Sequence, residues 1–107
     1  MIAAQPAAHH SPPVRVQVVA REFSYVLSRR TVTAGPAIVE LVNAGQDAHD
    51  LRLRRVGGTH VYRWPTVPPG GHTDREIRLG PGRYVLWCAL ADHRERGMHA
   101  VLVVRRR

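Results

Sequence analysis

Nine short β-rich runs, separated by turn residues, follow one another along this chain. Valine, whose β-branched side chain favours strands, occurs 15 times. Turn signals such as Gly57-Gly58 and Gly80-Pro81-Gly82 separate the runs, and no stretch has a sustained helical period. Many short strands at this spacing predict an all-β antiparallel sandwich or barrel. The expected strands are 14–20, 23–27, 31–33, 37–43, 49–56, 60–63, 73–79, 82–88 and 99–105.

A chain of 107 residues is the size of one ordinary domain, and we see no internal repeat. We expect a flexible Ala/Pro leader over residues 1–13 and one folded domain over residues 14–107. The leader lacks the basic start and the sustained apolar stretch of a signal peptide. The apolar runs are too short for a transmembrane helix, and the single cysteine excludes a disulfide within the chain.

The formal net charge is +8, and all 16 basic residues are arginine. A basic chain can bind nucleic acid, but these arginines are scattered over most of the expected strands without interleaved aromatic residues. We therefore predict no nucleic-acid binding, and a basic surface that attracts acidic partner proteins. The three charges of Arg105-Arg106-Arg107 would give only weak attraction to an anionic membrane.

Alternation of side chains places two chemically distinctive residues on core faces. In run 49–56, His49 shares its face with Leu51 and Leu53, so His49 points inward where that strand begins. In run 82–88, Cys88 shares its face with apolar residues and lies at the strand's end. In a sandwich, the start of one strand and the end of the other can lie at the same pole. We therefore expect His49 and Cys88 to meet there.

The loop after Cys88 has the spacing C-x4-H-x4-M, which adds His93 and Met98. Together with His49 it offers two imidazoles, one thiolate and one thioether. Two His and one Cys with a distant axial Met are the ligands of a blue-copper electron-transfer site. We predict that these four residues bind one copper ion.

Each candidate ligand also has an ordinary structural interpretation. Cys88 could be a buried inert thiol, Met98 could fill the core, and His99 competes with His93 for the second imidazole position. Zinc accepts the same Cys and His ligands. His9 and His10 could bind metal weakly within the leader.

These motifs resemble those of the cupredoxin family, the plastocyanin- and azurin-like type 1 (blue) copper proteins. The resemblance covers roughly 14–105, and a closing strand follows the last ligand. One departure is Asp50, since the family often has Asn directly after the first His ligand. Asp50 could accept the same hydrogen bonds, but its charge would lower the reduction potential. The matching segments are Val42-Asn43-Ala44-Gly45, Ala48-His49-Asp50, 80–88, 92–99 and 100–104.

The resemblance implies a cupredoxin-like Greek-key β-sandwich of about eight strands, with copper at one end. It implies that His93 is the solvent-facing ligand, that Trp87 offers a second electron route, and that small residues surround His93 for docking. It also implies a secreted protein of the periplasm or the extracellular space. We expect a monomer. The small residues are Ala48, Ala89 and Ala91.

The sequence thus predicts a mononuclear type 1 copper protein that transfers single electrons between redox partners. The alternative is a copper carrier or buffer that uses the same site, and a metal-free interaction domain is a third possibility. An enzyme is not expected, because the chain has no His-x-His motif for further copper centres and no second cysteine for a binuclear one. It also lacks the G-x-S-x-G motif of serine hydrolases.

Overall fold

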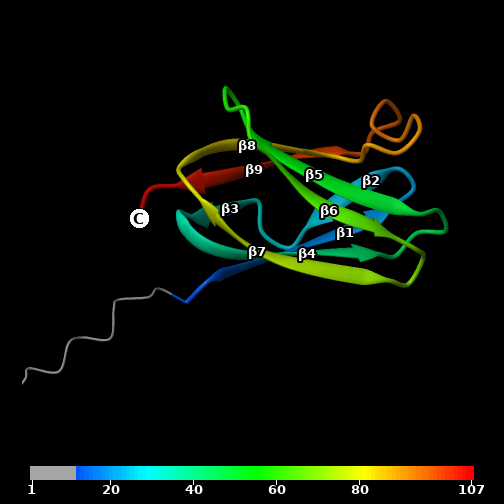
Figure 1. The fold of residues 1–107 in the computed structure, drawn as a ribbon, viewed down its shortest axis with the longest axis horizontal. Helices are drawn as coiled ribbons and strands as arrows, with labels where there is room; N and C mark the ends of the chain where they lie inside the picture. Colours follow the sequence, from blue (N-terminus) through cyan, green and yellow to red (C-terminus); the bar gives the residue numbers. More distant parts are fainter. Residues whose placement is uncertain (1–11) are drawn as a thin grey trace, which may run out of the picture.

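The structure is a computed structural model that describes residues 12–107. The predicted leader, apart from Pro12 and Pro13, lies outside the described residues, as do His9 and His10. The described part is built from strands, packed as two sheets face to face (Figure 1). It contains no helix that is long and apolar enough to cross a membrane.

Nine strands make up the two sheets, which confirms the predicted all-β sandwich. The first sheet has the order β2-β1-β4-β7 and the second has the order β3-β9-β8-β5-β6. The chain passes from one sheet to the other after β2, β3, β4, β6 and β7. The strands are β1 (Val14–Arg21), β2 (Ser24–Leu27), β3 (Thr31–Thr33), β4 (Gly35–Asn43), β5 (His49–Arg55), β6 (Val61–Val67), β7 (His72–Leu79), β8 (Gly82–Trp87) and β9 (His99–Arg105).

The nine strands agree with the nine expected runs, but two details differ from the predictions. The sandwich is not wholly antiparallel, since β1 pairs in parallel with β4 and β3 with β9. The strand expected over 60–63 continues through Pro65 to Val67. Proline is tolerated there because β6 is at the edge of its sheet and need not donate on its open side.

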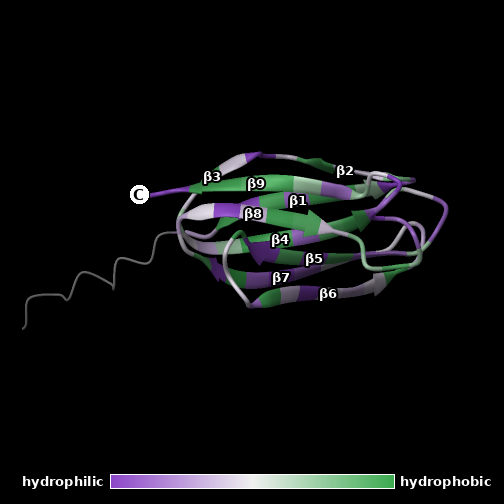
Figure 2. Ribbon diagram, turned by 90° about the horizontal axis from the view of Figure 1, so that it is seen from above, coloured by the Kyte–Doolittle hydropathy of each residue, from purple (hydrophilic) through white to green (hydrophobic). Residues whose placement is uncertain are grey.

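The core lies between the sheets, where alternate side chains of each strand are buried. In β5, Leu51 and Leu53 are fully buried, as their alternation predicted. Trp64 of β6 reaches across the core, and its indole N–H donates a hydrogen bond of 2.9 Å to the carbonyl of Val39 in β4. Figure 2 shows β9 largely in the hydrophobic colour, whereas β7 is largely hydrophilic because most of its outward side chains are charged or polar.

The antiparallel pairing of β5 with β8 determines which end of the sandwich holds His49 and Cys88. β5 begins at His49 and β8 ends at Trp87, with Arg52 opposite Trp87 in the pairing register. The start of β5 and the residue after β8 therefore lie at the same end of the sandwich, as expected. The loop of residues 88–98 caps this end (orange in Figure 1).

Candidate metal centre

His49 is fully buried where β5 begins. Its Nε2 lies 3.0 Å from a carboxylate oxygen of Glu22. Its Nδ1 is buried and has no hydrogen-bond partner among the described residues. A buried polar nitrogen without a partner is costly, so this atom fits the position of a metal ligand.

Cys88 and His93 lie beside His49. The thiol sulfur of Cys88 is 3.5 Å from Nδ1 of His93, and the rings of His49 and His93 have centroids 5.0 Å apart. One ligand atom from each of the three residues lies within 4.8 Å of the other two. Cys88 is 1% exposed and His93 is 8% exposed, so the group is almost closed to solvent.

This spacing fits a single metal ion. Three atoms within 4.8 Å of one another leave a point within about 2.8 Å of all three. That distance approaches the bonds of about 2.0–2.3 Å that nitrogen and sulfur form with the similar divalent ion zinc. Soft sulfur and imidazole donors together suit copper. The cluster therefore fits one copper ion, and the backbone of Met98 is hydrogen-bonded to both Cys88 and His93.

Met98 is fully buried, and its backbone closes the ligand loop. The N–H of Cys88 donates to the carbonyl of Met98 at 3.1 Å, and the N–H of Met98 donates to the carbonyl of His93 at 3.1 Å. Gly97 makes this turn with a φ of 119°, and an added Cβ would lie 3.0 Å from the carbonyl oxygen of Phe23. The three candidate ligands of this loop are thus held by their own backbone.

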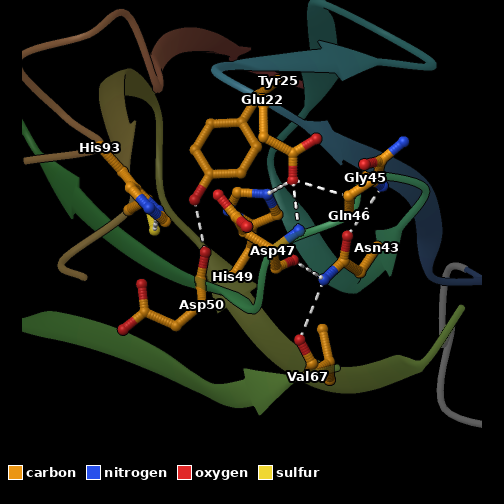
Figure 3. A network of polar contacts seen from close by, with 11 residues as sticks. Glu22, Tyr25, Asn43, Gly45, Gln46, Asp47, His49, Asp50, Val67 and His93 are labelled. Atoms are coloured by element: carbon orange, nitrogen blue, oxygen red, sulfur yellow. Dashed lines mark hydrogen bonds and ion pairs between the residues drawn. The ribbon is translucent and has the colours of Figure 1, made fainter. Parts of the chain in front are cut away.

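Asp50 joins the start of β5 to the loop of residues 88–98. It is 2% exposed, and its Oδ1 accepts a hydrogen bond of 2.8 Å from the N–H of Ala89. Tyr25 donates its hydroxyl hydrogen to the backbone carbonyl of Asp50 (Figure 3). The second carboxylate oxygen lies 3.5 Å from Nε of Arg52, an ion pair without hydrogen-bond geometry.

We expect Asp50→Ala to lower the free energy of unfolding of the metal-free protein by about 1–3 kcal/mol, because the N–H of Ala89 loses its acceptor. Asp50→Asn keeps an acceptor oxygen and should cost clearly less. Urea unfolding followed by fluorescence measures both. Equal losses in the two variants would contradict the role of this hydrogen bond.

Burial affects the acid–base chemistry of Cys88. Removal from water raises the pKa of the thiol, while backbone hydrogen bonds from Asp50 and Leu90 oppose that rise and the Asp50 charge adds to it. The thiol is therefore protonated at neutral pH in the metal-free protein. Because the thiolate is the form that binds metal, metal binding would release this proton.

Sequence reasoning missed Glu22, which lies between β1 and β2. Its Oε1 accepts hydrogen bonds from the N–H groups of Gln46 at 2.7 Å and Asp47 at 2.5 Å, and from His49 (Figure 3). The bond from Asp47 is the largest influence, and together with those from Gln46 and His49 it lowers the pKa of Glu22 to about 2, against the opposing effect of burial. No local pattern in the sequence marks Glu22, because its contact with His49 spans 27 residues; in the structure, an added Cβ at Gly45 would lie 2.5 Å from the same oxygen.

Asn43 supports the same loop from the inside. Its side-chain amide donates to the carbonyls of Asp47 at 2.7 Å and Val67 at 3.0 Å, and its oxygen accepts from the N–H of Gly45 at 2.9 Å. Asn43 is 1% exposed. The segment that leads into His49 is thus held between Asn43 and Glu22.

Other predicted residues lie apart from the cluster. His99 is exposed and does not join it within residues 12–107, so His93 is the second imidazole. The small residues Ala48, Ala89 and Ala91 are all exposed. The guanidinium carbon of Arg94 lies 5.0 Å from the centroid of the Trp87 ring.

The arginines are less scattered than the sequence suggested. Six of them lie where β5, β7 and β9 end and β8 begins, at the end opposite to His49. The ligand loop itself is balanced, with Asp92 and Glu95 against Arg94 and Arg96. The positive charge is therefore concentrated away from the cluster. The six are Arg55, Arg78, Arg83, Arg105, Arg106 and Arg107.

No protein-family profile matches the sequence, and no curated protein matches it. Solved structures do match the fold. Auracyanin A, a "blue" copper protein from the green thermophilic photosynthetic bacterium Chloroflexus aurantiacus, aligns with a TM-score of 0.74 at 15% identity, over 88% of this chain and 100% of that one. A purple cupredoxin from Nitrosopumilus maritimus aligns with a TM-score of 0.57 at 13% identity, over 85% and 98%.

One similar structure is an enzyme. The copper nitrite reductase from Nitrosomonas europaea aligns with a TM-score of 0.67 at 17% identity. The match covers 90% of this chain but 42% of that one, so more than half of the enzyme chain lies outside the shared fold. At these identities the comparisons show a shared fold.

Proposed function

Because this chain has the cupredoxin fold, we propose that it is a mononuclear type 1 copper protein that transfers single electrons between redox partner proteins. The observation that carries the proposal is the unpartnered Nδ1 of His49, buried beside one thiol and a second imidazole. We assign the metal ligands as Nδ1 of His49, the sulfur of Cys88, Nδ1 of His93 and the thioether of Met98. Copper, when bound, supplies a one-electron couple.

In such a transfer the protein holds the ligands rigidly and excludes solvent from them. His49 and Met98 are fully buried. The backbone N–H of Cys88 donates a hydrogen bond to the carbonyl of Met98, and Asp50 links the loop of residues 88–98 to β5. A rigid ligand set needs little rearrangement when the metal changes its charge. This rigidity and burial favour a shuttle over a carrier, because a carrier must open its site to deliver the ion.

We propose that the protein is not an enzyme. Four ligands from the chain would leave no open coordination position for a substrate, in contrast to the open position of catalytic metal sites. Electrons would pass through His93, which is the most exposed of the four ligands and shares its loop with the small exposed residues Ala89 and Ala91. A partner would dock on this end.

The charge distribution modifies the expectation about partners. Since the six clustered arginines lie at the opposite end, the net charge of +8 gives little reason for an acidic docking partner at the ligand loop. We propose docking through the small apolar residues around His93, by a monomer. A periplasmic or extracellular location is the location implied by the fold family.

The test is redox cycling in the presence of a copper(I) chelator. We expect the protein to bind one Cu(II) per chain, to lose its colour on reduction by ascorbate, and to regain it in full on reoxidation over repeated cycles. Transfer of the copper to the chelator during the reduced phase would instead support the carrier. A zinc-loaded sample, which cannot change its oxidation state, is the control for spectral changes of the protein itself.

A further inference from the structure

We propose that Glu22 orients the buried imidazole of His49 and sets how strongly the site prefers Cu(II) over Cu(I). This inference rests on the proposed function, because it concerns the same copper ion. Glu22 is 27 residues before His49 in the chain and reaches it from the loop between β1 and β2. It would be a positioning residue, acting through His49 without touching the metal.

The contact defines the tautomer of the imidazole. Oε1 of Glu22 already accepts hydrogen bonds from two backbone N–H groups, so it acts as an acceptor and the ring nitrogen 3.0 Å away must carry the hydrogen. In the neutral ring, Nε2 is then the donor and Nδ1 has the free lone pair. That is the nitrogen without a hydrogen-bond partner, and it is the one that a metal ion can use.

The structure also holds the carboxylate in place. The N–H groups of Gln46 and Asp47 bind the same oxygen as the imidazole, so Glu22 has three donors on one atom. Gly45 leaves the space that the carboxylate fills: an added Cβ would lie 2.5–2.9 Å from three of its atoms. A side chain fixed this firmly fixes the ring that it binds.

The electronic effect follows from the charge. A carboxylate that accepts the outer N–H of a metal-binding imidazole makes the ring a more basic ligand. A more basic ligand stabilises the doubly charged ion more than the singly charged one. Glu22 would therefore strengthen Cu(II) binding selectively and lower the reduction potential. The ring is buried but the Glu22 side chain is 26% exposed, so solvent screens part of this effect.

The decisive variant is Glu22→Gln, whose amide oxygen can still accept the three hydrogen bonds but carries no charge. We expect Cu(II) affinity to fall about tenfold, at the lower end of the effect of outer-shell mutations, with Cu(I) affinity unchanged. For a one-electron couple this equals a rise of about 59 mV in the reduction potential. Glu95→Gln is the matched control, because it removes the same charge from an exposed position in the ligand loop.

A second measurement needs no metal. In the metal-free protein we expect nitrogen-15 NMR to show His49 with its hydrogen on Nε2 and slow exchange of that hydrogen with water. Glu22→Ala, which removes the acceptor, should produce a mixture of tautomers or fast exchange.

The outcomes separate the two proposals. A proton on Nδ1 in the wild-type apoprotein, or equal potential shifts for Glu22→Gln and Glu95→Gln, would overturn the role of Glu22. A wild-type protein that binds no copper but has the expected tautomer would overturn the proposed function instead. If Glu22→Gln did not fold, the tautomer and exchange rate of the wild-type protein would still decide the positioning role.

Discussion

Replacing Cys88 with serine is expected to abolish the intense visible absorption of the copper-loaded protein. That absorption needs charge transfer from a thiolate sulfur, and Cys88 is the only cysteine in the chain. Serine is nearly the same size, so the buried position beside His93 should still be filled. Since Cys88 would bind the metal directly, we expect copper affinity to fall by more than the roughly 100-fold upper range of outer-shell mutations.

The measurement is titration of the reduced apoprotein with Cu(II), followed by its visible spectrum and by competition with a chelator. Ala89→Ser is the matched control, because it adds the same hydroxyl at the next, exposed position. Its spectrum should keep the intense band. A band that survives in Cys88→Ser, or a wild-type protein that stays colourless with copper, would contradict the assignment of Cys88.

Replacing Trp64 with alanine should cause the largest loss of stability, about 3–5 kcal/mol in the free energy of unfolding. Trp64 is 2% exposed and fills the space between the sheets. Alanine would leave a cavity there and would also remove the hydrogen bond to the carbonyl of Val39 in the opposite sheet. The cavity and the lost hydrogen bond would both weaken the packing of β6 against the opposite sheet.

Urea unfolding of the metal-free protein, followed by circular dichroism, measures this loss. Arg63→Ala is the neighbouring control: the Arg63 side chain is exposed, so we expect its removal to change stability by no more than about 0.5 kcal/mol. A loss below about 1 kcal/mol for Trp64→Ala would mean that the packing between the sheets does not depend on this side chain.

The positions of most strands could be predicted from local signals, because alternation and turn residues act over only a few positions. The nine expected runs correspond to the nine strands. The predictions were wrong where the outcome depends on how strands are arranged and paired in the sheets. Pro65 is acceptable only because β6 is an edge strand, and the parallel pairing of β1 with β4 depends on how strands far apart in the chain are brought together.

For the metal centre, the sequence by itself determined the chemical identity and the spacing of the candidate ligands. Cys88, His93 and Met98 lie within one short loop, and the alternation of β5 turned His49 toward the core. A local spacing and a two-residue period are enough for this. The choice of His93 over His99 needed the fold, because only the backbone turn within the loop places one imidazole inside and the other outside.

The surroundings of the ligands were decided by tertiary structure alone. Glu22 reaches His49 because the end of β1 lies beside the loop after β4, an arrangement created by the parallel pairing of the two strands. The clustered arginines meet because strands of different directions end or begin at the same pole. Contacts of this kind join residues far apart in the chain, and no local pattern of side chains encodes which strand ends become neighbours.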